Sequence, residues 1–71
     1  METKTTIKGH TVSHGLDVSG GLKYLMYELD FQEAKVFFNE AHDHGSVIFE
    51  DHLDRKYKLI YHGGEYQLIR A

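Results

Sequence analysis

The sequence predicts a small α+β domain, in which one amphipathic helix packs on one face of a mostly antiparallel sheet. Three observations support this fold class. Apolar residues recur at helical spacing in one central segment, the C-terminal third alternates apolar and polar residues as strands do, and glycines separate these segments where turns are expected. The predicted order is β-β-α-β-β-β, within a single domain that spans residues 1–71.

Two strands are predicted before the helix. Residues 4–12 are rich in threonine and contain Gly9, which indicates a strand with a bulge. Residues 22–29 are ambiguous, because their leucines and Met26 also fit a helical stripe. If that stripe continued through Asp30 into the next segment, a single helix would carry two opposed apolar faces. We therefore predict a strand over 22–29.

The helix is predicted over 31–43. Asp30 is a favourable N-cap residue, and Glu33 three positions later completes a capping-box pattern. Gly45 is a natural residue to follow the helix C-terminus. One side of the predicted helix is apolar. Its residues are Phe31, Ala34, Phe37, Phe38 and Ala41.

Three strands are predicted after the helix. The last two flank a two-residue turn at Gly63–Gly64, which pairs Tyr61 with Tyr66. For the preceding hairpin we predict a three-residue loop at 53–55, which places Glu50 opposite Lys58.

These registers give the sheet two different faces. We expect the helix to cover the face that carries Val47, Phe49, Leu59, Tyr61, Tyr66 and Leu68. The other face carries Ile48, Ile60 and Ile69, which the same helix cannot cover. These isoleucines must lie under the N-terminal strands, against a partner, or exposed. We predict a homodimer interface at this face, because a contiguous apolar patch favours association.

Composition limits the classes of protein. The chain has no cysteine, no apolar stretch long enough to span a membrane and no visible signal peptide, so we expect a cytoplasmic protein. The formal net charge is −3, which argues mildly against general nucleic-acid binding. Residues 28–54 hold most of the acids against Lys35 alone, and the segment after them is basic.

Metal binding and catalysis are both predicted to be absent. The possible ligands are Glu40, His42, Asp43, His44, Asp51 and His52. On a helix, His42 and His44 are about 200° apart and cannot share one metal ion. We interpret both as cations at the helix C-terminus. No nucleophile, phosphate-binding or dinucleotide motif occurs, so we expect neither a cofactor nor an enzyme.

The remaining signal is an acidic surface suited to a basic protein partner. Its predicted residues are Glu33, Val36, Glu40, Asp43, Glu50 and Asp54. We therefore predict a non-enzymatic regulator or inhibitor that binds another protein. The alternative is a nucleic-acid-binding regulator that uses the basic, tyrosine-rich C-terminal hairpin. Its residues are Arg55, Lys56, Tyr57, Lys58, Tyr61, Tyr66 and Arg70.

Overall fold

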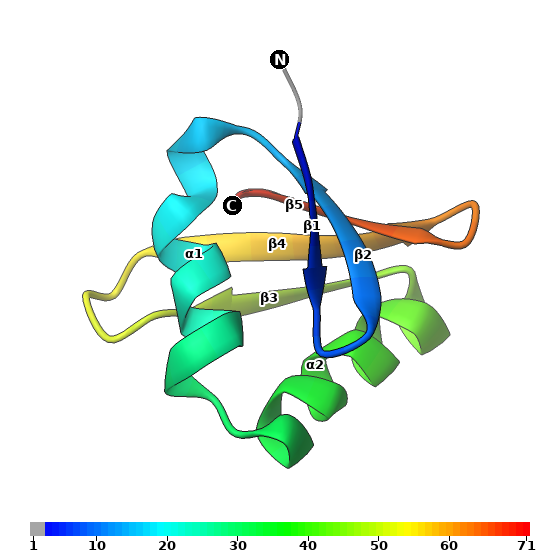
Figure 1. The fold of residues 1–71 in the computed structure, drawn as a ribbon, viewed down its shortest axis with the longest axis horizontal. Helices are drawn as coiled ribbons and strands as arrows, with labels where there is room; N and C mark the ends of the chain where they lie inside the picture. Colours follow the sequence, from blue (N-terminus) through cyan, green and yellow to red (C-terminus); the bar gives the residue numbers. More distant parts are fainter. Residues whose placement is uncertain (1–2) are drawn as a thin grey trace.

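A computed structural model of the chain describes residues 3–71 and confirms the α+β class (Figure 1). A mixed sheet has the strand order β1-β2-β5-β4-β3. Its strands are β1 (Thr3–Ile7), β2 (His10–His14), β3 (Ser46–Glu50), β4 (Lys56–His62) and β5 (Glu65–Arg70). Neighbouring strands are antiparallel except β2 and β5, which are parallel. Within these residues no helix is long and apolar enough to cross a membrane.

The chain between β2 and β3 is helical. It forms a 3-10 turn, η1 (Leu16–Val18), a short helix, α1 (Ser19–Lys23), a π-helical turn, η2 (Tyr24–Glu28), and the long helix α2 (Phe31–His44). In Figure 1 the first three elements stack along one side of the molecule, and α2 crosses below the sheet.

The predicted strand over 22–29 is therefore wrong. Residues 19–28 are helical instead, and Leu22 and Leu25 form a buried stripe on them. The conflict between two opposed apolar faces is resolved by a break in the chain direction. Leu29 has extended backbone angles, with φ −91° and ψ 142°, and Asp30 starts a separate helix. Each helix can then turn its own apolar face to the core.

The first predicted strand, 4–12, is a hairpin rather than one strand with a bulge. Lys8 and Gly9 form the two-residue turn, with φ values of 49° and 87°, and Ile7 pairs with His10. Positive φ at both turn residues is the geometry that matches the twist of a tight hairpin. Gly9 therefore reverses the chain, where the sequence had indicated a bulge.

Helix α2 forms as predicted and ends one residue later. The Asp30 carboxylate accepts a hydrogen bond from the Glu33 backbone N–H at 2.8 Å, and the Glu33 carboxylate accepts one from the Asp30 N–H at 3.2 Å. This capping box satisfies two backbone donors that the helix itself leaves free. At the other end, Gly45 adopts a left-handed conformation and its N–H bonds the carbonyl of Ala41 at 2.8 Å.

The β4–β5 hairpin has the predicted register, with Tyr61 opposite Tyr66. The β3–β4 hairpin does not, because Glu50 pairs with Lys56 rather than Lys58. The loop is two residues longer than predicted and is built around Asp51. Since a shift of two residues preserves the alternation of side chains, the two faces of the sheet are as predicted.

The core lies between the sheet and the helices. The β1–β2 hairpin crosses the direction of β3–β5 in Figure 1 and contributes Ile7 and Val12 to the same buried cluster as Leu59 and Leu68. This hairpin extends the sheet beyond β5 and faces the core, so it does not cover the isoleucine face. Ile48 is 59% exposed as a result.

Candidate functional site

The outer side of α2 carries an exposed acidic stripe, formed by Glu33, Val36, Glu40 and Asp43. These four residues fall within one side of the helix at 100° per residue. Val36 is 57% exposed and lies among the three acids. The opposite side of α2 is built into the core. Its buried residues are Ala34, Phe38 and Ala41.

The acids of this stripe have contacts on the helix itself. Glu33 belongs to the capping box. The Glu40 carboxylate lies 3.4 Å from Nε2 of His44, and the Asp43 carboxylate lies 3.3 Å from Nδ1 of His42. All of these side chains are more than half exposed, so the pairs add little to stability. Their carboxylates stay accessible to a partner.

Two further residues of the predicted acidic surface lie elsewhere. Phe49 faces α2, where its ring centroid lies 5.3 Å from that of Phe37. The next residue, Glu50, therefore points to the other face of the sheet. Asp54 lies in the β3–β4 loop, where its φ is 61°. The fold brings together four of the six predicted residues and separates Glu50 and Asp54 from them.

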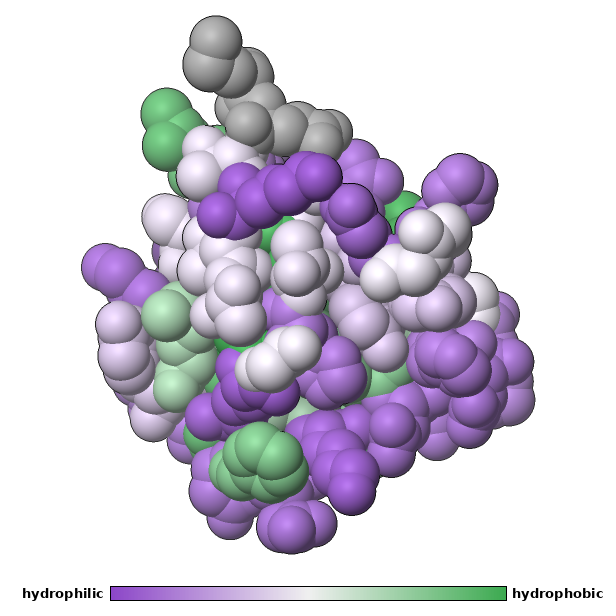
Figure 2. Space-filling view, turned by 45° about the vertical axis from the view of Figure 1, so that its right-hand side comes forward, coloured by the Kyte–Doolittle hydropathy of each residue, from purple (hydrophilic) through white to green (hydrophobic). Residues whose placement is uncertain are grey.

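Figure 2 shows one side of the molecule by hydropathy. Hydrophilic side chains cover most of its lower right, at the height of α2 in Figure 1, and a hydrophobic side chain stands out at the bottom. The surface on this side is therefore mainly polar, with isolated apolar groups.

The tyrosines of the basic hairpin are mainly core residues. Tyr57 is 1% exposed and Tyr66 is 7% exposed, and Tyr61 packs against the same cluster. The Tyr66 hydroxyl donates to the carbonyl of Phe38 at 3.3 Å. The rings of Tyr57 and Tyr66 are not presented to solvent in the way that base stacking requires.

Asp51 holds the β3–β4 loop together, although the sequence had suggested it only as a possible metal ligand. One carboxylate oxygen accepts the backbone N–H groups of Leu53 and Arg55, at 2.9 and 3.0 Å. The other oxygen accepts hydrogen bonds from Nε of Arg55 at 2.8 Å and from the hydroxyl of Tyr57 at 3.0 Å. We call this arrangement the Asp51 clamp. Its local signal is an aspartate followed by loop residues whose amides it can bind.

The clamp shifts the pKa of the Asp51 carboxyl and that of the Tyr57 hydroxyl in opposite directions. Burial alone would raise the pKa of Asp51, but its four hydrogen bonds outweigh that effect and lower the pKa from 3.8 to about 2. Burial, followed by the neighbouring Asp51 carboxylate, raises the pKa of Tyr57, so its hydroxyl remains a donor. Both effects favour a fixed structural unit.

Three histidines of the C-terminal half of the chain lie beside different acidic residues. Within residues 3–71, no three side chains of the ligand types come together around one point. His42 and His44 contact different acids, and His52 lies 3.6 Å from the Glu28 carboxylate.

The isoleucine face is open but divided by a cation. Ile48 and Ile69 lie on either side of Lys58 in neighbouring strands, and Ile60 lies in the next row. Lys58 is half-buried, so its apolar stem covers part of this surface.

Comparison of the chain with models of known protein families, with curated proteins and with solved structures finds no match.

Proposed function

We propose that this protein is a small non-enzymatic regulator or inhibitor, which binds a basic surface of another protein through the acidic stripe of α2. The observation that carries the proposal is the exposed set of Glu33, Val36, Glu40 and Asp43 on one side of a helix whose other side is buried. Three carboxylates around one apolar side chain suit a partner that presents lysines or arginines around a shallow apolar site.

The rigidity of α2 supports this role. The helix is capped at both ends and anchored through Phe38, which is fully buried. A surface that is already ordered loses little conformational entropy on binding. The stripe therefore needs no rearrangement of the helix to meet a partner.

Charge would contribute mainly to the rate and selectivity of association. An exposed ion pair is worth only about 0.2–1 kcal/mol, and salt screens it. Complementary charge nevertheless raises the association rate and disfavours partners of the same sign. Val36 supplies the apolar contact at the centre of the stripe, and its exposed area would be buried in the complex.

We place this activity in the cytoplasm, because the chain carries no cysteine for disulfide bonds. We also propose that the protein acts as a homodimer, with Ile48, Ile60 and Ile69 at the interface. In such a dimer the acidic stripes would remain free, since α2 packs on the opposite face of the sheet.

A charge-reversal experiment tests the acidic stripe. The variant E40K/D43K reverses two of its acids and leaves the capping box of Glu33 intact. The matched control D17K/E65K makes the same change in net charge outside the stripe, on η1 and at the start of β5. Each variant, bearing an affinity tag, is used to capture proteins from the native host, and captured proteins are quantified at low and high salt.

We expect a specific partner to be retained by the wild type and by D17K/E65K and lost with E40K/D43K. High salt should weaken its binding. A partner captured equally by both variants would contradict the proposed surface, because the charge change is the same and only its position differs.

The alternative, nucleic-acid binding by the C-terminal hairpin, is separated from this by an electrophoretic mobility shift. DNA or RNA binding that weakens with salt, and is lost on K56E/R70E, would favour the hairpin. The burial of Tyr57 and Tyr66 leads us to expect no shift.

A further inference from the structure

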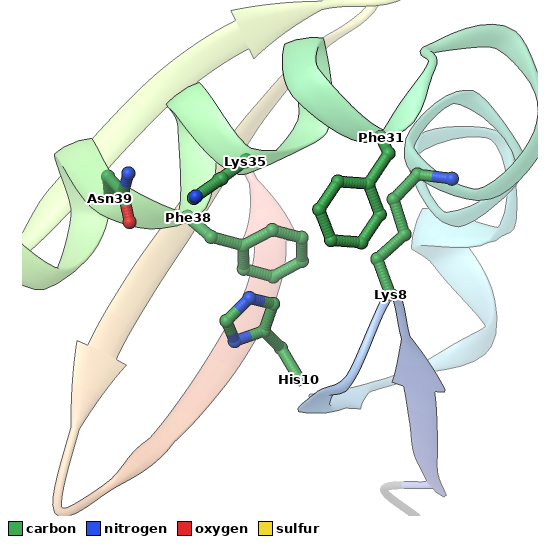
Figure 3. A pocket seen from close by; sticks show the side chains of 6 residues that line it. All are labelled: Lys8, His10, Phe31, Lys35, Phe38 and Asn39. Carbon is green, nitrogen blue, oxygen red and sulfur yellow. The ribbon is translucent and has the colours of Figure 1, made fainter.

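A cavity of about 110 Å³ lies between the β1–β2 turn and α2 (Figure 3). It is lined by Lys8, His10, Phe31, Lys35, Phe38 and Asn39. We call it the Lys8–Lys35 cavity. None of the residues proposed for partner binding lines it, so its role is independent of the acidic stripe.

The base of the cavity is aromatic and held in place. The His10 ring stacks on Phe38, with centroids 4.3 Å apart and planes 20° apart, and meets the edge of Tyr66 at 5.3 Å. Phe38 is fully buried, whereas Phe31 is 57% exposed. Figure 3 shows the Phe31 ring between the stem of Lys8 and the ring of Phe38. A flat apolar group entering here would meet aromatic rings.

The rim of the cavity is cationic, and no acidic residue lines it. The Lys8 amine donates to the Met26 carbonyl at 3.4 Å, which is a long contact, and in the described part of the chain Lys35 has neither an ion pair nor a hydrogen bond. The chain as a whole has a formal net charge of −3. The cavity is therefore a locally cationic site, with two lysines and no acidic residue, in a chain whose net charge is negative.

The cavity also offers polar groups that nothing in residues 3–71 satisfies. His10 makes ring contacts there, and its nitrogens have no hydrogen-bond partner in that part of the chain. In Figure 3 the Lys35 amine lies on the side toward the Asn39 amide. Together with Lys35, these groups supply donors for an acceptor at the mouth of the cavity.

The position of Lys8 has an energetic cost. Its φ of 49° is in the left-handed region, where a residue with a β-carbon is disfavoured by about 1 kcal/mol or more. Glycine or asparagine would suit this turn position better. The turn therefore holds a lysine stem against Phe31 at a position where lysine is not the residue that the backbone prefers.

We propose that the Lys8–Lys35 cavity binds a small planar carboxylate, with its ring against the aromatic base and its carboxylate toward the Lys35 amine, while Lys8 adds positive charge on the other side of the Phe31 ring. The volume of about 110 Å³ is below the about 150 Å³ of an apolar cavity that holds benzene and far below the about 300 Å³ of drug-sized sites, so at most one small ring fits and the carboxylate would lie at the mouth. The same chemistry occurs in a free aromatic acid and in a C-terminal phenylalanine of a polypeptide.

The probe for this site is benzoate, titrated into the full chain at constant ionic strength and followed by NMR. We expect saturable shifts of the His10, Phe31 and Phe38 ring signals, with a Kd on the order of 1 mM for a ligand of this size. Benzamide, which has the same shape without the charge, should bind at least about fivefold more weakly, because it loses the charge-assisted contacts.

Two variants locate the site. Lys35→Gln removes an exposed amine, and Lys8→Asn removes the other while suiting the left-handed turn, so both should fold. Each should weaken benzoate binding several-fold, whereas Lys23→Gln, an exposed lysine outside the cavity, should not. Absence of saturable shifts, equal binding of benzamide, or unchanged binding by both cavity variants would overturn the proposal.

A second titration separates the two sources of the ligand. A short peptide that ends in phenylalanine is compared with benzoate and with the same peptide carrying a C-terminal amide. Tighter binding of the acid peptide than of benzoate would assign the cavity to a chain terminus, and weaker binding would assign it to a free acid.

Discussion

The hydroxyl of Tyr57 donates to the Asp51 carboxylate at 3.0 Å and thereby ties strand β4 to the loop that precedes it. The same tyrosine ring packs against Gly21 of α1, and the guanidinium of Arg70 lies 5.6 Å from its centroid. One side chain therefore joins α1, the β3–β4 loop and β5. Because a domain this small is only marginally stable, we expect the loss of these contacts to have a large effect on its stability.

The first prediction concerns the Asp51 clamp. Because folding lowers the pKa of Asp51 from 3.8 to about 2, its carboxylate stabilises the fold above about pH 4. That contribution is lost as the pH falls from about 4 to about 2. Asp51→Asn should lower the melting temperature at pH 7 by on the order of 5 °C or more. The asparagine NH2 group is itself a donor, so it cannot accept the hydrogen bonds that one carboxylate oxygen of Asp51 accepts.

Thermal unfolding followed by circular dichroism between pH 2 and 7 measures this. The variant should show a flatter decline in stability below pH 4 than the wild type. Asp54→Asn is the matched control, since Asp54 is exposed and asparagine tolerates its φ of 61°. An equally steep acid decline in Asp51→Asn would show that other carboxylates dominate.

The second prediction concerns the close approach of Gly21 to Tyr57. A β-carbon added at Gly21 would lie 2.9 Å from Cδ1 of the buried Tyr57 ring. Helix propensity favours alanine over glycine by about 1 kcal/mol, whereas overpacking a core costs about 1–3 kcal/mol. We expect Gly21→Ala to be destabilised overall in chemical denaturation, while Ser19→Ala on the exposed side of α1 is not. A stabilised Gly21→Ala would contradict this packing.

The third prediction concerns the start of α2. Asp30→Ala removes the side-chain acceptor for the Glu33 N–H and should cost about 1 kcal/mol. Asp30→Asn retains an acceptor oxygen and should cost much less. Urea denaturation of the two variants measures the difference, and equal stabilities would show that the capping box contributes little.

The fourth prediction concerns the isoleucine face. If this face forms the proposed homodimer, light scattering at tens of micromolar should give twice the mass of the chain, and Ile48→Glu should give the mass of a monomer. Ile48 is 59% exposed, so the substitution leaves the core intact. Val36→Glu on α2 is the matched control and should remain a dimer. A wild-type monomer would remove the proposal, and Lys58 at the centre of the face would account for it.

Some features of this protein follow from the sequence alone. Helix α2 follows from its apolar spacing and from Asp30, Glu33 and Gly45, because capping and periodicity act over a few residues. The β4–β5 register follows from the Gly63–Gly64 turn for the same reason. The acidic stripe of α2 follows in turn from the position of the helix.

Other features were decided by contacts between distant segments. Residues 22–29 carry an apolar pattern that fits two structures, and the chain adopts the helical one. Gly20 and Gly21 let α1 approach Tyr57, because a β-carbon at either position would clash with that side chain. The β3–β4 register depends on the buried Asp51 rather than on the charge pair of Glu50 with Lys58.

The acidic stripe and the Lys8–Lys35 cavity also differ in how far the local sequence determines them. The acidic stripe was predictable as far as one helix extends. Glu50 lies apart from it, because the alternation of β3 places Glu50 on the face of Ile48, as the predicted register already implied. The Lys8–Lys35 cavity had no sequence signal, since its lysines lie far apart in the chain and only the β1–β2 turn brings them together. Local patterns determine elements, and the packing of those elements determines which side chains share a site.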